Sequence, residues 1–292
     1  MLKNKLIYVF LLLSANHLLA QEMPSDATFL SVSKEYSLQT DGSWTFRYSH
    51  QLQIHTYYAF HNLYGEDFIV YNPAFQALKV NKSVTTMADG RQIPSPENAY
   101  NEILPGFAVN VPAYNHLREM VVTHTGLERG AVIDFDYTLT SAKGYSQAMM
   151  GNEQLLMNSP VTKLTLKINV PTGARINFEQ YNIPVKPTIV KSGGIVSYTW
   201  VLTQLPAALR EDFRPREQQN RPGIVFLAMN KSTDVLALFA DQEAFKCEIT
   251  QESKAKAAEA VAGIANPLVK ALKLQELVAN ELNTWRVPLK NT

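Results

Sequence analysis

The stretch "SWTFRYSHQLQI", from Ser43 to Ile54, decides the fold class of this chain. Its even positions carry large apolar or aromatic residues and one histidine: Trp44, Phe46, Tyr48, His50, Leu52 and Ile54. Polar residues occupy the odd positions between them. Because successive side chains of a β-strand point to opposite faces, this period of two predicts a strand with one face in a core and the other in water.

The same alternation returns in "KLTLKINV" (163–170) and "IVSYTWVL" (195–202), and more weakly over residues 30–38. Turn signals separate these stretches. Asp41-Gly42 lies between residues 30–38 and residues 43–54 and predicts a hairpin. Many short strands with frequent turns indicate a mainly β fold, an antiparallel β-sandwich.

The end of the chain has a helical pattern instead. Residues 253–265 are rich in alanine, and Asn266-Pro267 is expected to end or kink that helix. A second helix is predicted over 267–285, where five apolar residues share one face: Leu274, Leu277, Val278, Leu282 and Trp285. The sandwich is therefore expected to carry a C-terminal helical tail.

Two proline-containing segments are predicted to connect these elements. Residues 94–115 contain four prolines and are expected to form a long ordered loop. Residues 210–223 are rich in arginine and proline and are expected to form a solvated connection.

The first twenty residues resemble a secretory signal peptide. Lys3 and Lys5 precede an apolar run over residues 6–13, and Ala20 stands before Gln21. We expect cleavage between Ala20 and Gln21, and a periplasmic or secreted protein of a Gram-negative bacterium. The alternative is an N-terminal membrane anchor, although a permanent span needs about 20 apolar residues.

The charge balance argues against a nucleic-acid partner. The chain has 27 basic and 26 acidic residues, and loss of Lys3 and Lys5 with the signal peptide leaves a formal charge of −1. Neither a basic stripe nor a second long apolar segment is present, so we expect no nucleic acid and no integral anchor after cleavage. Cys247 is the single cysteine, which excludes an intramolecular disulfide.

One stretch has the composition of a polar site: "HTGLERGAVIDFDYTLTS", residues 124–141. Asp134 and Asp136 share one face of a predicted strand, roughly 6.5–7 Å apart. That spacing fits paired-carboxylate chemistry, but it is also the pattern of a half-buried strand. Because no third ligand has a fixed spacing, the sequence favours two aspartates that face water.

The other candidate residues are also interpreted as structural. His124 is expected to be a surface or capping residue, and Glu128 and Arg129 to form the exposed tip of a turn. The remaining histidines considered, His50, His55, His61 and His116, lack a zinc-site spacing. Cys247 lacks the glycine or helix start that presents a catalytic thiol, so we expect a small half-buried strand residue there.

No phosphate-binding loop, dinucleotide motif or nucleophile elbow occurs in the sequence. The residues alone therefore predict no catalytic, cofactor-binding or metal-ligating position, and no cofactor.

The order of features resembles the domain of unknown function 3857, a β-sandwich module of exported bacterial proteins. The resemblance covers roughly residues 29–229 by the order of strands and turns. Four segments carry it: "SLQTDGSWTFRYSHQLQI" (37–54), "MADGRQIPSPENA" (87–99), "REMVVTHTGLERGAVIDFDYTL" (118–139) and "VLTQLPAALREDFRP" (201–215).

The resemblance implies that a transglutaminase-like domain with a Cys-His-Asp triad follows such a module. The tail "ALKLQELVANELNTWRVPL" resembles the first helix of that domain, and the triad would be expected beyond Thr292. The expected organisation is a signal peptide over 1–20, a β-sandwich module over 21–230, and a linker with a helical tail over 231–292.

We therefore expect an exported, non-catalytic accessory or binding module with a protein or glycan partner. Three alternatives stay open at this point. The chain could be part of a transglutaminase-like acyltransferase or peptidase. It could be a glycan-binding module that uses Tyr57, Tyr58 and Tyr100, or a hydrolase that uses Asp134 and Asp136.

Overall fold

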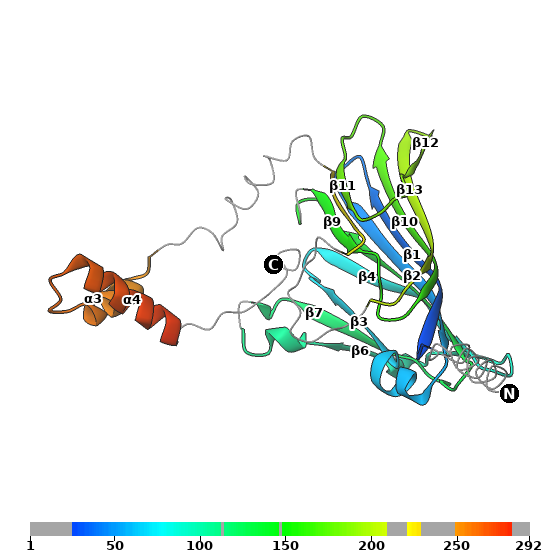
Figure 1. The fold of residues 1–292 in the computed structure, drawn as a ribbon, viewed down its shortest axis with the longest axis horizontal. Coiled ribbons are helices and arrows are strands. Elements are labelled where there is room, and N and C mark those ends of the chain that lie inside the picture. Colours follow the sequence, from blue (N-terminus) through cyan, green and yellow to red (C-terminus); the bar gives the residue numbers. More distant parts are fainter. Residues whose placement is uncertain (1–24, 112–113, 146–147, 209–220, 229–248, 282–292) are drawn as a thin grey trace, which may run out of the picture.

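The computed structural model describes residues 25–111, 114–145, 148–208, 221–228 and 249–281. It is a β-sandwich in which one eight-stranded sheet faces two three-stranded sheets, and two helices follow near the end of the chain (Figure 1). The predicted fold class, mainly β with a C-terminal helical tail, is confirmed.

The large sheet contains the four alternating stretches of the sequence at its centre. In spatial order its strands are β12 (Thr188–Ser192), β13 (Ile195–Leu205), β10 (Val161–Pro171), β1 (Ala27–Leu38), β2 (Trp44–Ile54), β8 (Val132–Ser141), β4 (Gln76–Thr86) and β5 (Gln92–Pro94). The hairpin predicted at Asp41-Gly42 joins β1 to β2, and Gly42 adopts a positive φ of 90° there.

One strand pair differs from the antiparallel expectation. β1 and β10 run parallel, with Phe29 opposite Val161 and Ser37 opposite Asn169. Among the described residues, the other strand pairs of the large sheet are antiparallel. A parallel pair needs a long crossover rather than a hairpin, so local turn signals could not indicate it.

The two small sheets cover the other side of the core (Figure 1). One contains β11 (Asn177–Tyr181), β14 (Gly223–Ala228) and β9 (Met149–Gln154), and the other contains β3 (Glu66–Tyr71), β7 (Arg118–Thr123) and β6 (Tyr100–Ile103). β6 lies inside the segment 94–115, which was expected to be a loop throughout. That expectation was wrong for Pro94, the last residue of β5, and for the four residues of β6, which is added to the edge of β7 by backbone pairing.

The core lies between these layers and follows the predicted alternation. Leu52 and Ile54 of β2, and Ile133 and Phe135 of β8, are at most 1% exposed. The other large and fully buried side chains come from both layers: Trp200, Phe226, Leu117, Met149, Leu155, Leu164, Leu166 and Ile168. Burial of such side chains stabilises the fold by about 1.5–3 kcal/mol each.

The helical tail comprises α3 (Gln251–Ala260) and α4 (Pro267–Glu281). Thr250 caps α3, because its hydroxyl accepts a hydrogen bond from the Ser253 amide at 3.1 Å. Neither helix buries a side chain, although Leu274 and Leu277 of the predicted apolar face are half-buried. Within the described residues, no helix is long and apolar enough to cross a membrane.

Several predicted features lie outside the described residues. These are the signal peptide, most of the 210–223 connection, Cys247, and Leu282 and Trp285 of the apolar helix face.

Candidate functional site

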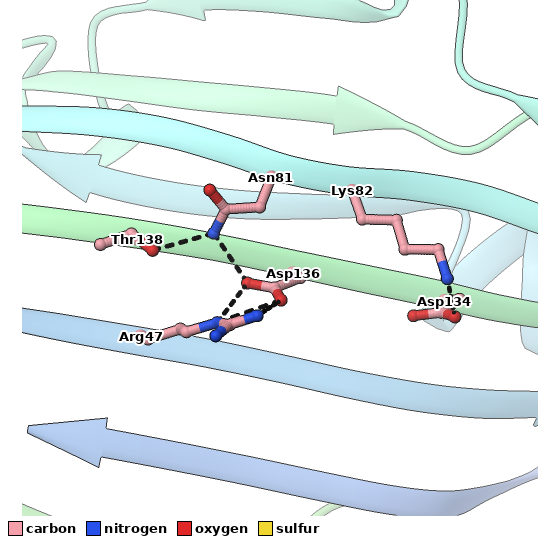
Figure 2. Close-up of polar contacts among 6 residues, drawn as sticks. All are labelled: Arg47, Asn81, Lys82, Asp134, Asp136 and Thr138. Atoms are coloured by element: carbon pink, nitrogen blue, oxygen red, sulfur yellow. Dashed lines mark hydrogen bonds and ion pairs between the residues drawn. The ribbon is translucent and has the colours of Figure 1, made fainter.

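Asp136, one of the two aspartates in the polar stretch, forms an ion pair on the outer face of the large sheet (Figure 2). The Nε of Arg47, on β2, donates to both carboxylate oxygens at 3.1 Å. From β4, Asn81 donates its Nδ2 hydrogen bonds to Asp136 Oδ1 and Thr138 Oγ1, each at 2.8 Å. A β-bulge between Val80 and Lys82 places an extra residue in β4 at this point.

Asp134 has a different basic partner. It forms an ion pair with Lys82 (Figure 2). The Nε2 atom of Gln51 lies 3.5 Å from the same carboxylate oxygen. Each aspartate thus has its own counter-ion. The arrangement does not support paired-carboxylate chemistry at these residues.

The expectation that both aspartates point to water was wrong for Asp136. Its side chain is 12% exposed, whereas that of Asp134 is 23% exposed. The residue is on the predicted outer face, but long side chains from the neighbouring strands β2 and β4 cover it. Burial alone raises the pKa of Asp136, but hydrogen bonds from Arg47 and Asn81 outweigh this effect and hold the pKa below the usual 3.8.

This polar row continues across further strands of the same sheet. Glu35 on β1 is the cross-strand neighbour of Arg47. It forms an ion pair with Lys167 of β10, whose Nζ lies 3.0 Å from Glu35 Oε1. Asn169 donates to Glu35 Oε1 at 2.7 Å, and Ser197 of β13 donates to Asn169 at 2.7 Å. Polar side chains therefore line this face across six neighbouring strands, which favours a structural role for it.

His124 was expected at the surface, and that expectation was wrong. Its side chain is 1% exposed. The Nε2 atom lies 2.9 Å from Asp67 Oδ2 on β3, and the Nδ1 atom lies 3.2 Å from Ser83 Oγ on β4. Because His124 directly follows β7, its ring enters the space between the small sheet and the large sheet and links them.

Ser83, His124 and Asp67 together have the composition of a catalytic Ser-His-Asp triad. Ser83, however, is only 5% exposed, and its Oγ also lies 2.7 Å from Ser95 Oγ. A nucleophile must be reachable by its substrate and needs an oxyanion site beside it. Ser83 is buried and its Oγ faces Ser95 and His124, so the geometry favours a buried link between sheets.

His50 lies beside this link and has no comparable partner. Neither ring nitrogen makes a hydrogen bond within the described part of the chain, and Nε2 is 3.9 Å from Asp67 Oδ2. The ring packs against Phe29, Tyr48 and Phe135. Burial lowers the pKa of His50 below its ordinary 6.5, so the imidazole is neutral at neutral pH.

A second link joins the other small sheet to the large one. Lys34 of β1 forms an ion pair with Glu153 of β9 at 2.6 Å, and the hydroxyl of Tyr36 donates to the same carboxylate. Polar side chains on the inner face of the large sheet thus meet one acid from each small sheet. Tyr48 of β2 lies opposite Lys34 in the register, and Tyr137 of β8 lies opposite Tyr48. We call the polar residues gathered here the seam cluster: Lys34, Tyr48, His50, Asp67, Tyr137 and Glu153.

Sequence reasoning missed the acidic members of this cluster. Asp67 and Glu153 occur in short segments without clear alternation, "EDFIVY" and "MMGNEQ". Lys34 and His50, by contrast, could have been recognised in the sequence as members of a buried polar cluster. Both occupy core-facing positions of alternating strands, where a charged or titratable residue requires a partner.

The remaining predicted residues have local roles. His55 Nε2 lies 2.9 Å from Thr28 Oγ1. Glu128 is half-buried rather than at an exposed tip, because its carboxylate accepts a hydrogen bond from the Ala88 amide at 2.9 Å. Arg129 is exposed, as predicted. His61 and His116 are exposed.

The aromatic residues considered for glycan binding do not share one environment. Tyr57 and Tyr58 are 65% and 55% exposed, whereas Tyr100 packs against the core.

Over the residues with a described placement, no group of three or more His, Cys, Asp or Glu residues could hold a metal ion.

The fold and these clusters define a β-sandwich module with two polar links between its layers. A family model, "Domain of Unknown Function with solved-structure structure (DUF3857)", matches residues 40–208, which is more than half of the chain. The chain belongs to the DUF3857 family, as the sequence resemblance predicted.

A solved structure supports the same fold. It is the crystal structure of "a putative protease from Parabacteroides distasonis ATCC 8503", with a TM-score of 0.82 and 37% sequence identity. The match covers 91% of this chain and 52% of that one, so this chain spans about half the length of that protein. No curated protein matches the chain.

Proposed function

We propose that this chain is a non-catalytic accessory module that binds a partner and works beside a catalytic domain in an exported protein. The observation that carries the proposal is the unequal coverage of the structural match. Nearly all of this chain corresponds to about half of a longer protein that is described as "a putative protease". In this proposal the unmatched half supplies the chemistry and the sandwich supplies recognition.

The polar clusters support this division of roles. Asp134 and Asp136 are bound to Lys82 and Arg47, and His124 is held by Asp67 and Ser83. The aspartates are neutralised by these ion pairs, and Ser83 and His124 are each only 5% exposed, so a substrate has little access to them. The resemblance of the tail to the start of a transglutaminase-like domain supports an acyl-transfer or peptidase partner domain.

An activity assay tests the proposal. We expect protein exported by and purified from a Gram-negative host to show no turnover of casein, and none of an amine donor with a glutamine acceptor. Cys247→Ser is the matched control, because Cys247 is the single thiol of the chain. Turnover by the wild type that disappears in this variant would contradict the accessory role and identify Cys247 as a nucleophile.

One observation favours a second candidate, a serine hydrolase. Ser83, His124 and Asp67 are connected in the order that a triad requires. A fluorophosphonate probe decides between the candidates, since it reacts only with an activated serine. We expect no labelling of the wild type. Labelling that is lost in Ser83→Ala but kept in Ser95→Ala would establish the hydrolase instead.

A further inference from the structure

An exposed turn with several aromatic rings joins β2 to β3 at one end of the sandwich, where it forms the blue coil at the bottom of Figure 1. Residues 57–63, which we call the aromatic turn, include a short π-helix over Ala59–Leu63. Tyr57 is 65% exposed, Tyr58 is 55% exposed, and His61 is exposed as well. π-Helical turns are rare and occur frequently at functional sites, which makes this turn a candidate site.

Three rings of the aromatic turn form a row. The ring centroid of Phe60 lies 5.4 Å from that of Tyr57 and 4.5 Å from that of His61. Residues three and four positions apart in a helix share a face, which brings Phe60 and His61 to the side of Tyr57. Phe60 is half-buried, whereas the rings on both sides of it are exposed. A partner at this surface therefore meets adjoining rings rather than one isolated tyrosine.

Contacts on the core side hold the aromatic turn in place. The Ala59 amide donates to Thr56 Oγ1 at 3.2 Å, and the Thr56 hydroxyl donates to Asp26 Oδ1 at 2.6 Å. Ala59 is fully buried, and the hydroxyl of Tyr64 lies 2.7 Å from Ser159 Oγ. The exposed rings thus stand on an anchored backbone. Such a preorganised surface loses less conformational freedom when it binds a partner.

The composition of this segment indicates the chemistry of the partner. Residues 55–65, "HTYYAFHNLYG", contain no Asp, Glu, Lys or Arg. Nucleic acids and anionic membranes are bound largely through basic side chains, which this segment lacks. Leu63, 39% exposed, is the one exposed aliphatic side chain of the aromatic turn, whereas a helix that enters lipid presents a whole apolar face. The turn therefore fits an uncharged partner that has both apolar and polar surface.

We propose that the aromatic turn binds an uncharged oligosaccharide whose sugar rings have equatorial substituents. Each such ring presents a face of C–H groups, and the negative π-face of an aromatic side chain attracts them. Tyr58 and Asn62, both exposed and four residues apart, supply hydrogen-bond donors and acceptors for the hydroxyl rim of the sugar. This inference rests on the proposed binding role and names the chemistry of the partner.

Calorimetric titration with defined sugars tests the proposal. The probes are cellotetraose and tetra-N-acetylchitotetraose, and sorbitol is the control, because it has hydroxyl groups but no ring face. We expect saturable binding of at least one tetrasaccharide to the protein purified as for the activity assay, and no binding of sorbitol. Absence of binding to both tetrasaccharides, or equal binding of sorbitol, would overturn the proposal.

Vesicles of phosphatidylcholine separate a sugar from a membrane as the partner. Exposed tyrosines are also common where proteins touch a membrane surface, so this alternative needs its own measurement. We expect the protein to stay in the supernatant when the vesicles are sedimented. Sedimentation with the vesicles together with no sugar binding would replace the oligosaccharide by a lipid surface.

Paired variants locate the site. Tyr57→Ala should weaken binding of the tetrasaccharide roughly tenfold, because it removes one stacking ring. Phe75→Ala is the matched control and should not change the affinity, since Phe75 is 47% exposed but lies at the opposite end of the large sheet. It precedes Gln76, which lies opposite Ser141, and Ser141 lies opposite Trp44 at the other end of β2.

A conservative variant separates the ring from the hydroxyl. Tyr57→Phe keeps the stacking ring and should keep most of the affinity. Both Tyr57 variants should unfold at the same urea concentration as the wild type, because the side chain is mostly exposed. A Tyr57→Ala protein with unchanged sugar affinity would place the sugar elsewhere and contradict the proposal.

The titration and the activity assay fail separately. Turnover that disappears in Cys247→Ser would contradict the accessory role, even in a protein that binds the sugar. An inactive protein that binds neither tetrasaccharide would contradict the oligosaccharide site alone.

Discussion

At the scale of single residues, Asp136 should contribute measurably to stability. Asp136→Asn keeps the shape of the side chain but removes the charge that Arg47 and Asn81 bind. Because the carboxylate is mostly buried, we expect a loss of about 1–3 kcal/mol in the free energy of unfolding. Asp134→Asn is the matched control and should cost about 0–1 kcal/mol, since its partner Lys82 is half exposed. Urea denaturation of both variants measures the difference; equal losses would contradict the assigned burial.

His50 should make stability depend on pH. Its pKa is lowered in the folded state, so the unfolded chain binds a proton more readily as the pH falls below 6.5. The contribution of neutral His50 to the free energy of unfolding is then fully present above pH 6.5. It is lost as the pH falls from 6.5 toward the lowered pKa. His50→Gln should reduce this loss, and exposed His61→Gln should not. Denaturation midpoints over this range test the prediction, and identical profiles for the two variants would refute it.

At the scale of elements, Gly151 sets how closely β9 packs against β14. A Cβ atom at this position would lie 2.4 Å from Cε1 of Phe226, whose ring is 1% exposed. Gly151→Ala should therefore force the ring to move and destabilise the protein by about 1–3 kcal/mol. Gly106→Ala is the control, because nothing lies within 4 Å of its added Cβ. Thermal unfolding distinguishes the two, and equal melting temperatures would show that the ring moves freely.

The elements that were predictable are those with a clear period. β2, β8, β10 and β13 lie at the centre of the large sheet, and their alternating residues bury one face. The small sheets were not predictable in the same way, because β3, β6 and β9 are short and their burial depends on packing against other elements. Asp136 and His124 were misassigned for a related reason, since side chains from neighbouring strands cover them.

At the scale of the whole molecule, the first twenty residues are predicted to direct export. Protein produced in a Gram-negative host should begin at Gln21, because Ala20 completes the signal-peptide pattern. N-terminal sequencing of the periplasmic or secreted fraction checks this prediction. A Leu13→Arg variant, which interrupts the apolar run, serves as the control and should retain its first residues. A wild-type protein that keeps residues 1–20 would favour the membrane-anchor alternative.

The parallel pairing of β1 with β10 also has a consequence in time. β1 is the first strand to be synthesised, yet it lies at the centre of the finished sheet between β2 and β10. Its hairpin with β2 can form early, but its other edge stays unpaired until more than a hundred further residues have been synthesised. At roughly 5–20 residues per second, this delay is on the order of ten seconds. We expect the charges of Lys34 and Glu35 on this open edge to discourage pairing with another nascent chain during that interval.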